Sequence, residues 1–133
     1  MIAGFIKQYL FTLLIGTGII LISLLPLSVP GEPPSFLFPG LDKWIHGIMY
    51  GVFMVVFLRD YLKQNRWRFK MILGILFLAL LCSALIEVVQ KIFISSRSGE
   101  IRDFLANMGG LVAGLLLVIA VRMIRFGSVH GPA

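Results

Sequence analysis

The chain consists of long apolar blocks separated by short polar segments. Four blocks carry few or no charged residues, and the segments between them are rich in charged residues, proline or serine. A helix that crosses the hydrocarbon core of a bilayer needs about 20 mainly apolar residues, and the blocks approach or reach that length. The pattern therefore predicts four transmembrane helices, at roughly residues 6–26, 43–61, 69–93 and 102–125.

The second block is the shortest of the four. Only 15 residues separate Lys43 from Arg59. Long basic side chains can extend their charged ends toward the headgroups while their aliphatic stems stay in the apolar layer. We therefore expect this block to span the membrane with both ends reaching outward in this way.

Composition agrees with a membrane protein. Of the 133 residues, 59% are hydrophobic, and the mean hydropathy is +0.98, well above that of soluble domains. The length suits one domain at most. We expect an all-α fold, a four-helix transmembrane bundle, in which residues 1–133 form a single membrane domain. The lone Cys82 excludes a disulfide within one chain.

Basic residues predict the orientation of the helices. They concentrate at Lys7, in residues 59–70, and at Arg122 and Arg125. Short loops rich in Lys and Arg stay in the cytoplasm. We therefore expect both termini inside and the connections at 26–42 and 91–103 outside.

The basic loop at 59–70 also predicts a partner. Its segment "RWRFK" interleaves basic residues with Trp and Phe, as membrane-interface anchors do. The loop is short and adjoins two membrane helices, so we expect it to contact anionic lipids and not nucleic acid.

Helical spacing sorts the polar residues and glycines onto faces. Asp103, Asn107, Gly110 and Gly114 form one stripe on the fourth helix, whose glycines permit close approach of another helix. The corresponding faces are Ser83, Glu87 and Gln90 on the third helix, Asp42, His46 and Tyr50 on the second, and Gln8, Thr12, Gly16 and Ser23 on the first. We expect these faces to point into the bundle.

The most polar of these side chains lie at similar depths. With a rise of about 1.5 Å per residue, they fall about one to two turns below the outer surface, and we expect almost nothing comparable in the inner half. The sequence thus predicts one outer polar pocket. Its members are Asp42, Lys43, His46, Glu87, Gln90, Asp103 and Asn107, with Arg97 and Arg102 from the adjoining loop.

Glu87 is the member of this pocket whose burial in the membrane costs the most. A carboxylate at such a depth is costly unless it is paired or takes up a proton. We expect it to face inward toward Lys43, Arg97 or Arg102. Such charges mark a functional site by default, but ion pairs inside a membrane also fix the register of helices, so both interpretations remain open.

Three segments carry a family resemblance. "DKWIHGIMY" (42–50), "EVVQ" (87–90) and "RSGEIRDFLANMGG" (97–110) together resemble the VanZ-like family of small bacterial membrane proteins. The family pattern runs Asp-Lys-x-x-His, Glu-x-x-Gln, an Arg, and Asp-x-x-x-Asn followed by Gly. The match spans residues 42–114. Gly47 departs from it, since a bulky residue usually follows the histidine, and Arg102 adds a charge beside Asp103.

The resemblance implies a role in the cell envelope. The family's namesake is an accessory factor that lowers susceptibility to the lipoglycopeptide antibiotic teicoplanin. A related protein is expected in the bacterial inner (plasma) membrane as a multi-pass protein acting at the outer face. The resemblance leaves the substrate and the chemistry open.

The residue types in the pocket suit two tasks. His46, Glu87 and Asp103 are candidate catalytic groups, because together they can supply an acid and a base. Lys43, Arg97 and Arg102 can hold a phosphate or diphosphate, such as that of a prenyl-phosphate carrier or a lipid-linked precursor. The other candidate substrate-binding residues are Asp42, Tyr50, Gln90 and Asn107.

Two hypotheses follow. The first is a protein that binds or modifies an amphiphilic envelope molecule and contributes to teicoplanin tolerance; whether it is an enzyme stays open. The second is a structural or partner-binding subunit whose buried charges only lock helix packing. A metal held by His46, Glu87 and Asp103 is disfavoured by the single histidine and a nearby lysine, and we expect no cofactor. Transport is disfavoured because polar residues do not continue through the inner half.

Overall fold

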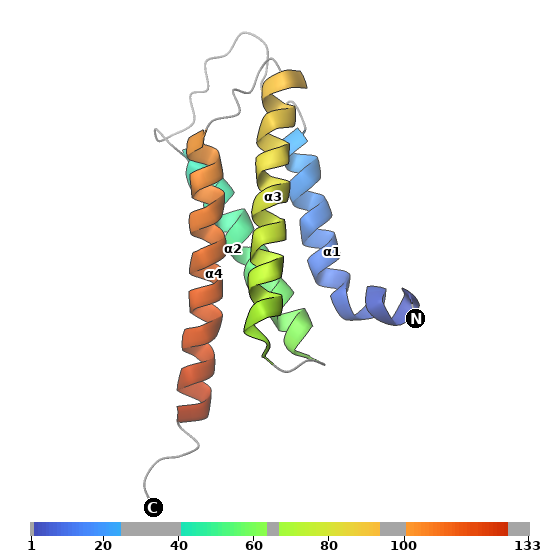
Figure 1. The fold of residues 1–133 in the computed structure, drawn as a ribbon, viewed down its shortest axis with the longest axis vertical. Helices are drawn as coiled ribbons and strands as arrows, with labels where there is room; N and C mark the ends of the chain where they lie inside the picture. The colour runs from blue at the N-terminus through green and yellow to red at the C-terminus, as the bar shows by residue number, and fades with distance from the viewer. Residues whose placement is uncertain (1, 25–40, 64–66, 94–100, 128–133) are drawn as a thin grey trace, which may run out of the picture.

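The computed structural model describes residues 2–24, 41–63, 67–93 and 101–127. These residues form four helices, α1 (Ile2–Leu24), α2 (Leu41–Leu62), α3 (Phe69–Phe93) and α4 (Ile101–Gly127), which run side by side in alternating directions (Figure 1). The all-helical prediction is confirmed, and the helix boundaries lie within a few residues of those predicted. We call the end where α2 and α4 begin the upper end, as in Figure 1, and the opposite end the lower end.

All four helices are long and apolar enough to cross a membrane, including the short second block, where the candidate span is Lys43–Leu62. Large apolar side chains remain exposed around the outside of the bundle, including Phe77, Leu116 and Leu117. Bilayer hydrocarbon can cover such a surface, whereas water would not. The chain is therefore a multi-pass membrane protein in contact with the lipid bilayer.

The tightest helix contact is between α2 and α4. A Cβ atom added to Gly110 would overlap the carbonyl oxygen of Gly47, and one added to Gly114 would lie 2.5 Å from the carbonyl oxygen of Gly51. The two backbones approach so closely because these positions lack side chains. The predicted glycine stripe is confirmed at Gly110 and Gly114, whereas a Cβ atom at Gly47 would make only an ordinary 3.4 Å contact with the Ala106 carbonyl oxygen.

Helix α1 is bent near its start. Tyr9 has φ −104° and ψ 18°, outside the helical region, and the segment before it turns sideways from the rest of α1 (Figure 1). A non-helical residue interrupts the i to i−4 hydrogen-bond pattern, so amides in the next turn need other acceptors. A carboxylate on α2 supplies one.

Candidate functional site

A chain of hydrogen bonds joins three helices near the upper end. His46 Nδ1 on α2 lies 3.1 Å from Asn107 Oδ1 on α4, and Asn107 Nδ2 donates to Ser83 Oγ on α3 over 2.8 Å. The Tyr50 hydroxyl, one turn below His46, also makes a side-chain hydrogen bond with Ser83. The close α2–α4 contact holds His46 and Asn107 within reach, because Gly47 and Gly110 lie beside them.

The hydrogen bond to Asn107 determines which His46 nitrogen is basic. Asn107 directs its NH2 group to Ser83, so its carbonyl oxygen faces the imidazole. A carboxamide oxygen can only accept, and the neutral ring therefore carries its hydrogen on Nδ1. His46 Nε2 is left as the nitrogen that can accept a hydrogen bond or a proton.

A more accessible ion pair lies above this chain of hydrogen bonds. Lys43 Nζ lies 3.8 Å from Asp103 Oδ1, and the two side chains are 30% and 13% exposed. Asp103 is in the first turn of α4, where the helix dipole favours a negative charge. The pair therefore presents a cation and an anion close to the surface, one turn above His46 and Asn107.

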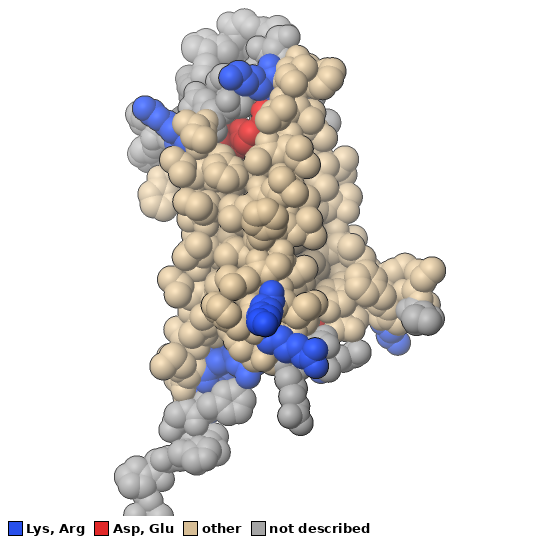
Figure 2. Space-filling view, in the orientation of Figure 1, with Lys and Arg blue, Asp and Glu red and all other residues tan. Residues whose placement is uncertain are grey.

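Glu87 completes the acidic groups of this region. It is 8% exposed, lies one turn above Ser83 on α3, and is close enough to Tyr50 for an electrostatic interaction. Figure 2 shows acidic atoms at the upper end of one face, above a broad band that carries no charge. We call the group at this end the upper cluster; it comprises Lys43, His46, Ser83, Glu87, Asp103 and Asn107.

The predicted stripes do point inward. Ser83, Glu87 and Gln90 are buried on α3, and His46, Tyr50, Asp103 and Asn107 are buried on α2 and α4. Gln90 lies outside the chain of bonds above: its Nε2 donates to the carbonyl oxygen of Ser23 over 2.7 Å and so joins α3 to α1.

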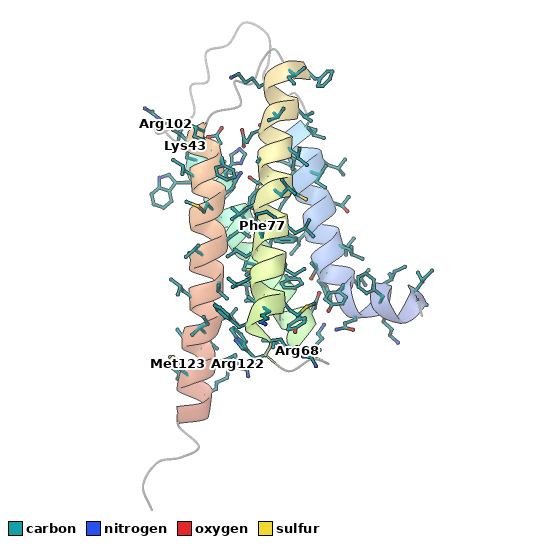
Figure 3. All side chains as sticks on the ribbon, in the orientation of Figure 1. Lys43, Arg68, Phe77, Arg102, Arg122 and Met123 are labelled. Atoms are coloured by element: carbon teal, nitrogen blue, oxygen red, sulfur yellow. The ribbon has the colours of Figure 1, made fainter. Side chains whose placement is uncertain are left out.

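Other predicted site residues lie at the margin or beyond the described part. Arg102 is exposed, and Figure 3 shows it beside Lys43 at the upper end with its side chain directed away from the bundle. Arg97 and the side chain of Asp42 lie outside the described residues. Within the described residues, no three His, Cys, Asp or Glu side chains are grouped so that they could hold a metal ion.

A second buried polar group lies at the lower end, so the expectation of almost nothing comparable there is wrong. Asp60 on α2 is 0% exposed. Its Oδ2 accepts from the Thr12 amide (3.1 Å) and hydroxyl (3.0 Å), and its Oδ1 pairs with Lys63 Nζ (2.8 Å). Gln8 Nε2 donates to the Asp60 carbonyl oxygen (3.4 Å). We call Gln8, Thr12, Asp60 and Lys63 the lower cluster.

The signal for the lower cluster was present in part. Gln8 and Thr12 share a face of α1, and Asp60 precedes Lys63 by one helical turn. The missing information was the bend at Tyr9, which leaves the Thr12 amide available to a carboxylate on another helix. No proline marks that bend.

Comparison with known proteins places these residues in a family. The model of the VanZ/LLP1 family matches residues 3–123. This match covers most of the chain and confirms the resemblance drawn from the three sequence segments. Comparisons with curated proteins and with solved structures gave no match.

Proposed function

Because the chain belongs to the VanZ/LLP1 family, we propose that it acts in the bacterial cell envelope by binding the polar headgroup of an amphiphilic molecule at the upper cluster. One observation carries the proposal. Side chains from α2, α3 and α4 join in a hydrogen-bonded chain from Ser83 through Asn107 to His46, directly below the accessible Lys43–Asp103 pair. Ionisable groups within membrane-spanning segments default to a functional role.

The charge distribution supports an outer-face location for this site. Of the basic residues in the described part of the chain, seven lie at the lower end and three at the upper end. Figure 3 shows Arg68 and Arg122 at the lower end and Lys43 and Arg102 at the upper end. Under the positive-inside rule this bias supports the proposal that the lower end faces the cytoplasm. The lower basic residues then face the anionic lipids of the inner leaflet.

The headgroup that suits this site contains a phosphate or diphosphate. Lys43 supplies an ammonium near the surface, Arg102 lies beside it at the upper end, and Arg97 precedes Arg102 by five residues in the sequence. Asp42, Tyr50 and Gln90 complete the proposed binding set. A prenyl-phosphate carrier or a lipid-linked precursor presents such a group in the outer leaflet, and its capture would change how much of it teicoplanin meets.

The same residues can move a proton. His46 Nε2 is available as a base, and Glu87 and Asp103 are carboxyl groups within the same cluster. Acid–base chemistry on a bound headgroup is the enzymatic form of the proposal, with His46, Glu87 and Asp103 as catalytic groups.

The proposal is tested by binding. The full chain is placed in phosphatidylcholine nanodiscs that contain increasing mole fractions of a polyprenyl phosphate, and bound lipid is measured by native mass spectrometry. Lys43→Ala is expected to weaken binding at least about tenfold, because a hydrogen bond to a charged group contributes about 1.5–3 kcal/mol. Lys91→Ala is the matched control, because Lys91 is an exposed lysine on α3 that also lies at the upper end of the bundle. Equal affinities for the two variants contradict the proposal.

A structural role is the second candidate, and the hydrogen bonds among α2, α3 and α4 favour it. If the upper cluster only locks the helices, Asn107→Ala lowers the melting temperature in detergent and no polyprenyl phosphate binds to the unaltered chain. Binding that is saturable and sensitive to Lys43 excludes this role as the only one.

A further inference from the structure

A groove runs along the membrane-spanning parts of α1, α2 and α3, below the upper cluster. Its volume is about 420 Å³, and its walls include Gly16 and Ile20 on α1, Tyr50 and Phe57 on α2, and Ala79 and Ile86 on α3. Ile20 and Leu78 at its margins are 46% and 52% exposed. The groove therefore opens toward the lipid between α1 and α3.

The walls of this groove are almost wholly apolar. Its polar groups are the Thr12 hydroxyl, which donates to Asp60, the Tyr50 hydroxyl, which makes a hydrogen bond with Ser83, and those of Tyr9, Tyr61 and Cys82. Water needs two to four polar partners to be held in a cavity. Hydrocarbon is therefore the natural occupant of this space.

The dimensions favour one extended chain. On α3 the lining positions run from Met71 to Ile86, about 22 Å at 1.5 Å per residue. A volume of about 420 Å³ spread over that length makes the groove long and narrow, whereas an α-helix is about 10 Å wide. A helix from a partner or a second copy of the chain does not fit inside it. The length exceeds the roughly 15 Å of one leaflet, half of a hydrocarbon core about 30 Å thick.

The groove adjoins the upper cluster at Tyr50, although no residue of that cluster lines it. Tyr50 forms part of its wall, and its hydroxyl reaches Ser83, which accepts from Asn107. On α3, Ile86 lines the groove and the next residue is Glu87. One molecule can therefore place a headgroup at the upper cluster and its tail in the groove.

The geometry points to a binding site for a single long hydrocarbon chain, the tail of the amphiphile whose headgroup lies at the upper cluster. This inference rests on the proposed function, which it extends by assigning the tail its own site between α1, α2 and α3. A chain held there is separated from the surrounding lipids and lies parallel to the helices. The protein then recognises both the headgroup and the length of the tail.

A matched pair of glycines on α1 tests this inference. A Cβ atom at Gly16 would lie 3.4 Å from Phe53 Cε2, an ordinary contact, so Gly16→Leu fills the groove without moving the backbone. Gly18 has open space around the corresponding position and does not line the groove, so Gly18→Leu adds the same side chain outside it. The melting temperature of each variant shows whether it folds, and Ala79→Leu is a second filling variant on α3.

The probe is a polyprenyl phosphate with a photoreactive diazirine on its prenyl chain, at low mole fraction in phosphatidylcholine nanodiscs containing the full chain. We expect cross-links on the lining positions of α1 and α3. Gly16→Leu or Ala79→Leu should reduce them about tenfold, because a well-filled space does not accept further methylene groups, and Gly18→Leu should leave them unchanged. Equal labelling in the Gly16 and Gly18 variants, or labels spread evenly over the lipid-facing surfaces, overturns the inference.

A third arm separates this inference from the proposed function. If Lys43→Ala abolishes labelling and the filling variants do not change it, the headgroup site stands and the tail site is refuted. If the filling variants reduce labelling and Lys43→Ala does not, the tail site stands and the headgroup assignment fails.

Discussion

The upper and lower clusters both place a carboxylate inside the bundle, but they differ in access. Asp60 in the lower cluster is 0% exposed and is held by Thr12 and by Lys63 at 2.8 Å. In the upper cluster the Asp103 side chain is 13% exposed and lies 3.8 Å from Lys43. The two lysines are both partly exposed, 41% for Lys63 and 30% for Lys43, so the clusters differ at the carboxylate. A fully buried carboxylate with short hydrogen bonds fixes helices to one another, whereas a partly exposed carboxylate in a longer ion pair can exchange its contacts for those of a ligand.

The position of each cluster agrees with a structural role for the lower cluster and a binding role for the upper cluster. The lower cluster bridges the bend of α1 and the end of α2, where the Asp60 carboxylate acts as an N-cap supplied by another helix. The upper cluster adjoins the apolar groove through Tyr50. The lower cluster therefore shapes α1, and α1 forms one wall of the groove.

Asp60→Ala should have the largest effect on stability. It leaves the Thr12 amide without its acceptor on α2 and removes the partner of Lys63. We expect a loss of about 2–3 kcal/mol in detergent unfolding, typical of a hydrogen bond to a charged group. Arg59→Ala is the neighbouring control. Arg59 is exposed with its guanidinium 5.2 Å from the Phe11 ring centroid, so its loss should cost less than about 1 kcal/mol. Similar losses for the two variants would show that the lower cluster does not stabilise the packing of α1 against α2.

Gly110→Ala should have the next largest effect, a loss of about 2 kcal/mol in unfolding free energy from overpacking against the backbone of Gly47. It should also separate His46 from Asn107 and weaken headgroup binding. Gly109→Ala is the matched control, because a Cβ atom there meets nothing within 4 Å. Unfolding and lipid binding measured on both variants test whether the α2–α4 contact builds the upper cluster. Equal behaviour of the two variants would rule this out.

Asn107→Ala should have a smaller effect on stability, about 1 kcal/mol, because hydrogen bonds between membrane helices contribute about 0.6 kcal/mol each on average. The loss of lipid binding should exceed the loss of stability, since His46 loses the partner that orients its ring. Thermal unfolding and lipid binding are measured on the same preparations. A large stability loss with unchanged binding would assign the upper cluster the role of the lower one.

Much of the fold can be predicted from the sequence, for physical reasons. The apolar blocks predict the four helices because a span must satisfy its backbone internally and match the bilayer thickness. The spacing of Asp103, Asn107 and Gly110 predicts the buried face of α4 because neighbours on a helix surface recur every three or four residues. Both predictions use only residues that lie close together in the sequence.

The lower cluster was not predicted, because it depends on a contact between distant parts of the chain. Thr12 and Asp60 are 48 residues apart, and they meet only because α1 bends at Tyr9. The outward direction of Arg102 likewise depends on how α4 is rotated against α2, which spacing alone does not determine. The groove arises from the space left between three helices, and no single stretch of sequence encodes it.

The most direct measurement compares the two lysines that pair with an aspartate at opposite ends of the bundle. Binding of a polyprenyl phosphate to the full chain in nanodiscs is measured for Lys43→Ala and for Lys63→Ala, with the unaltered chain as reference. We predict a dissociation constant raised at least about tenfold for Lys43→Ala and changed by less than about twofold for Lys63→Ala. Unchanged binding in Lys43→Ala, or an equal loss in both variants, would contradict a headgroup site at the upper cluster.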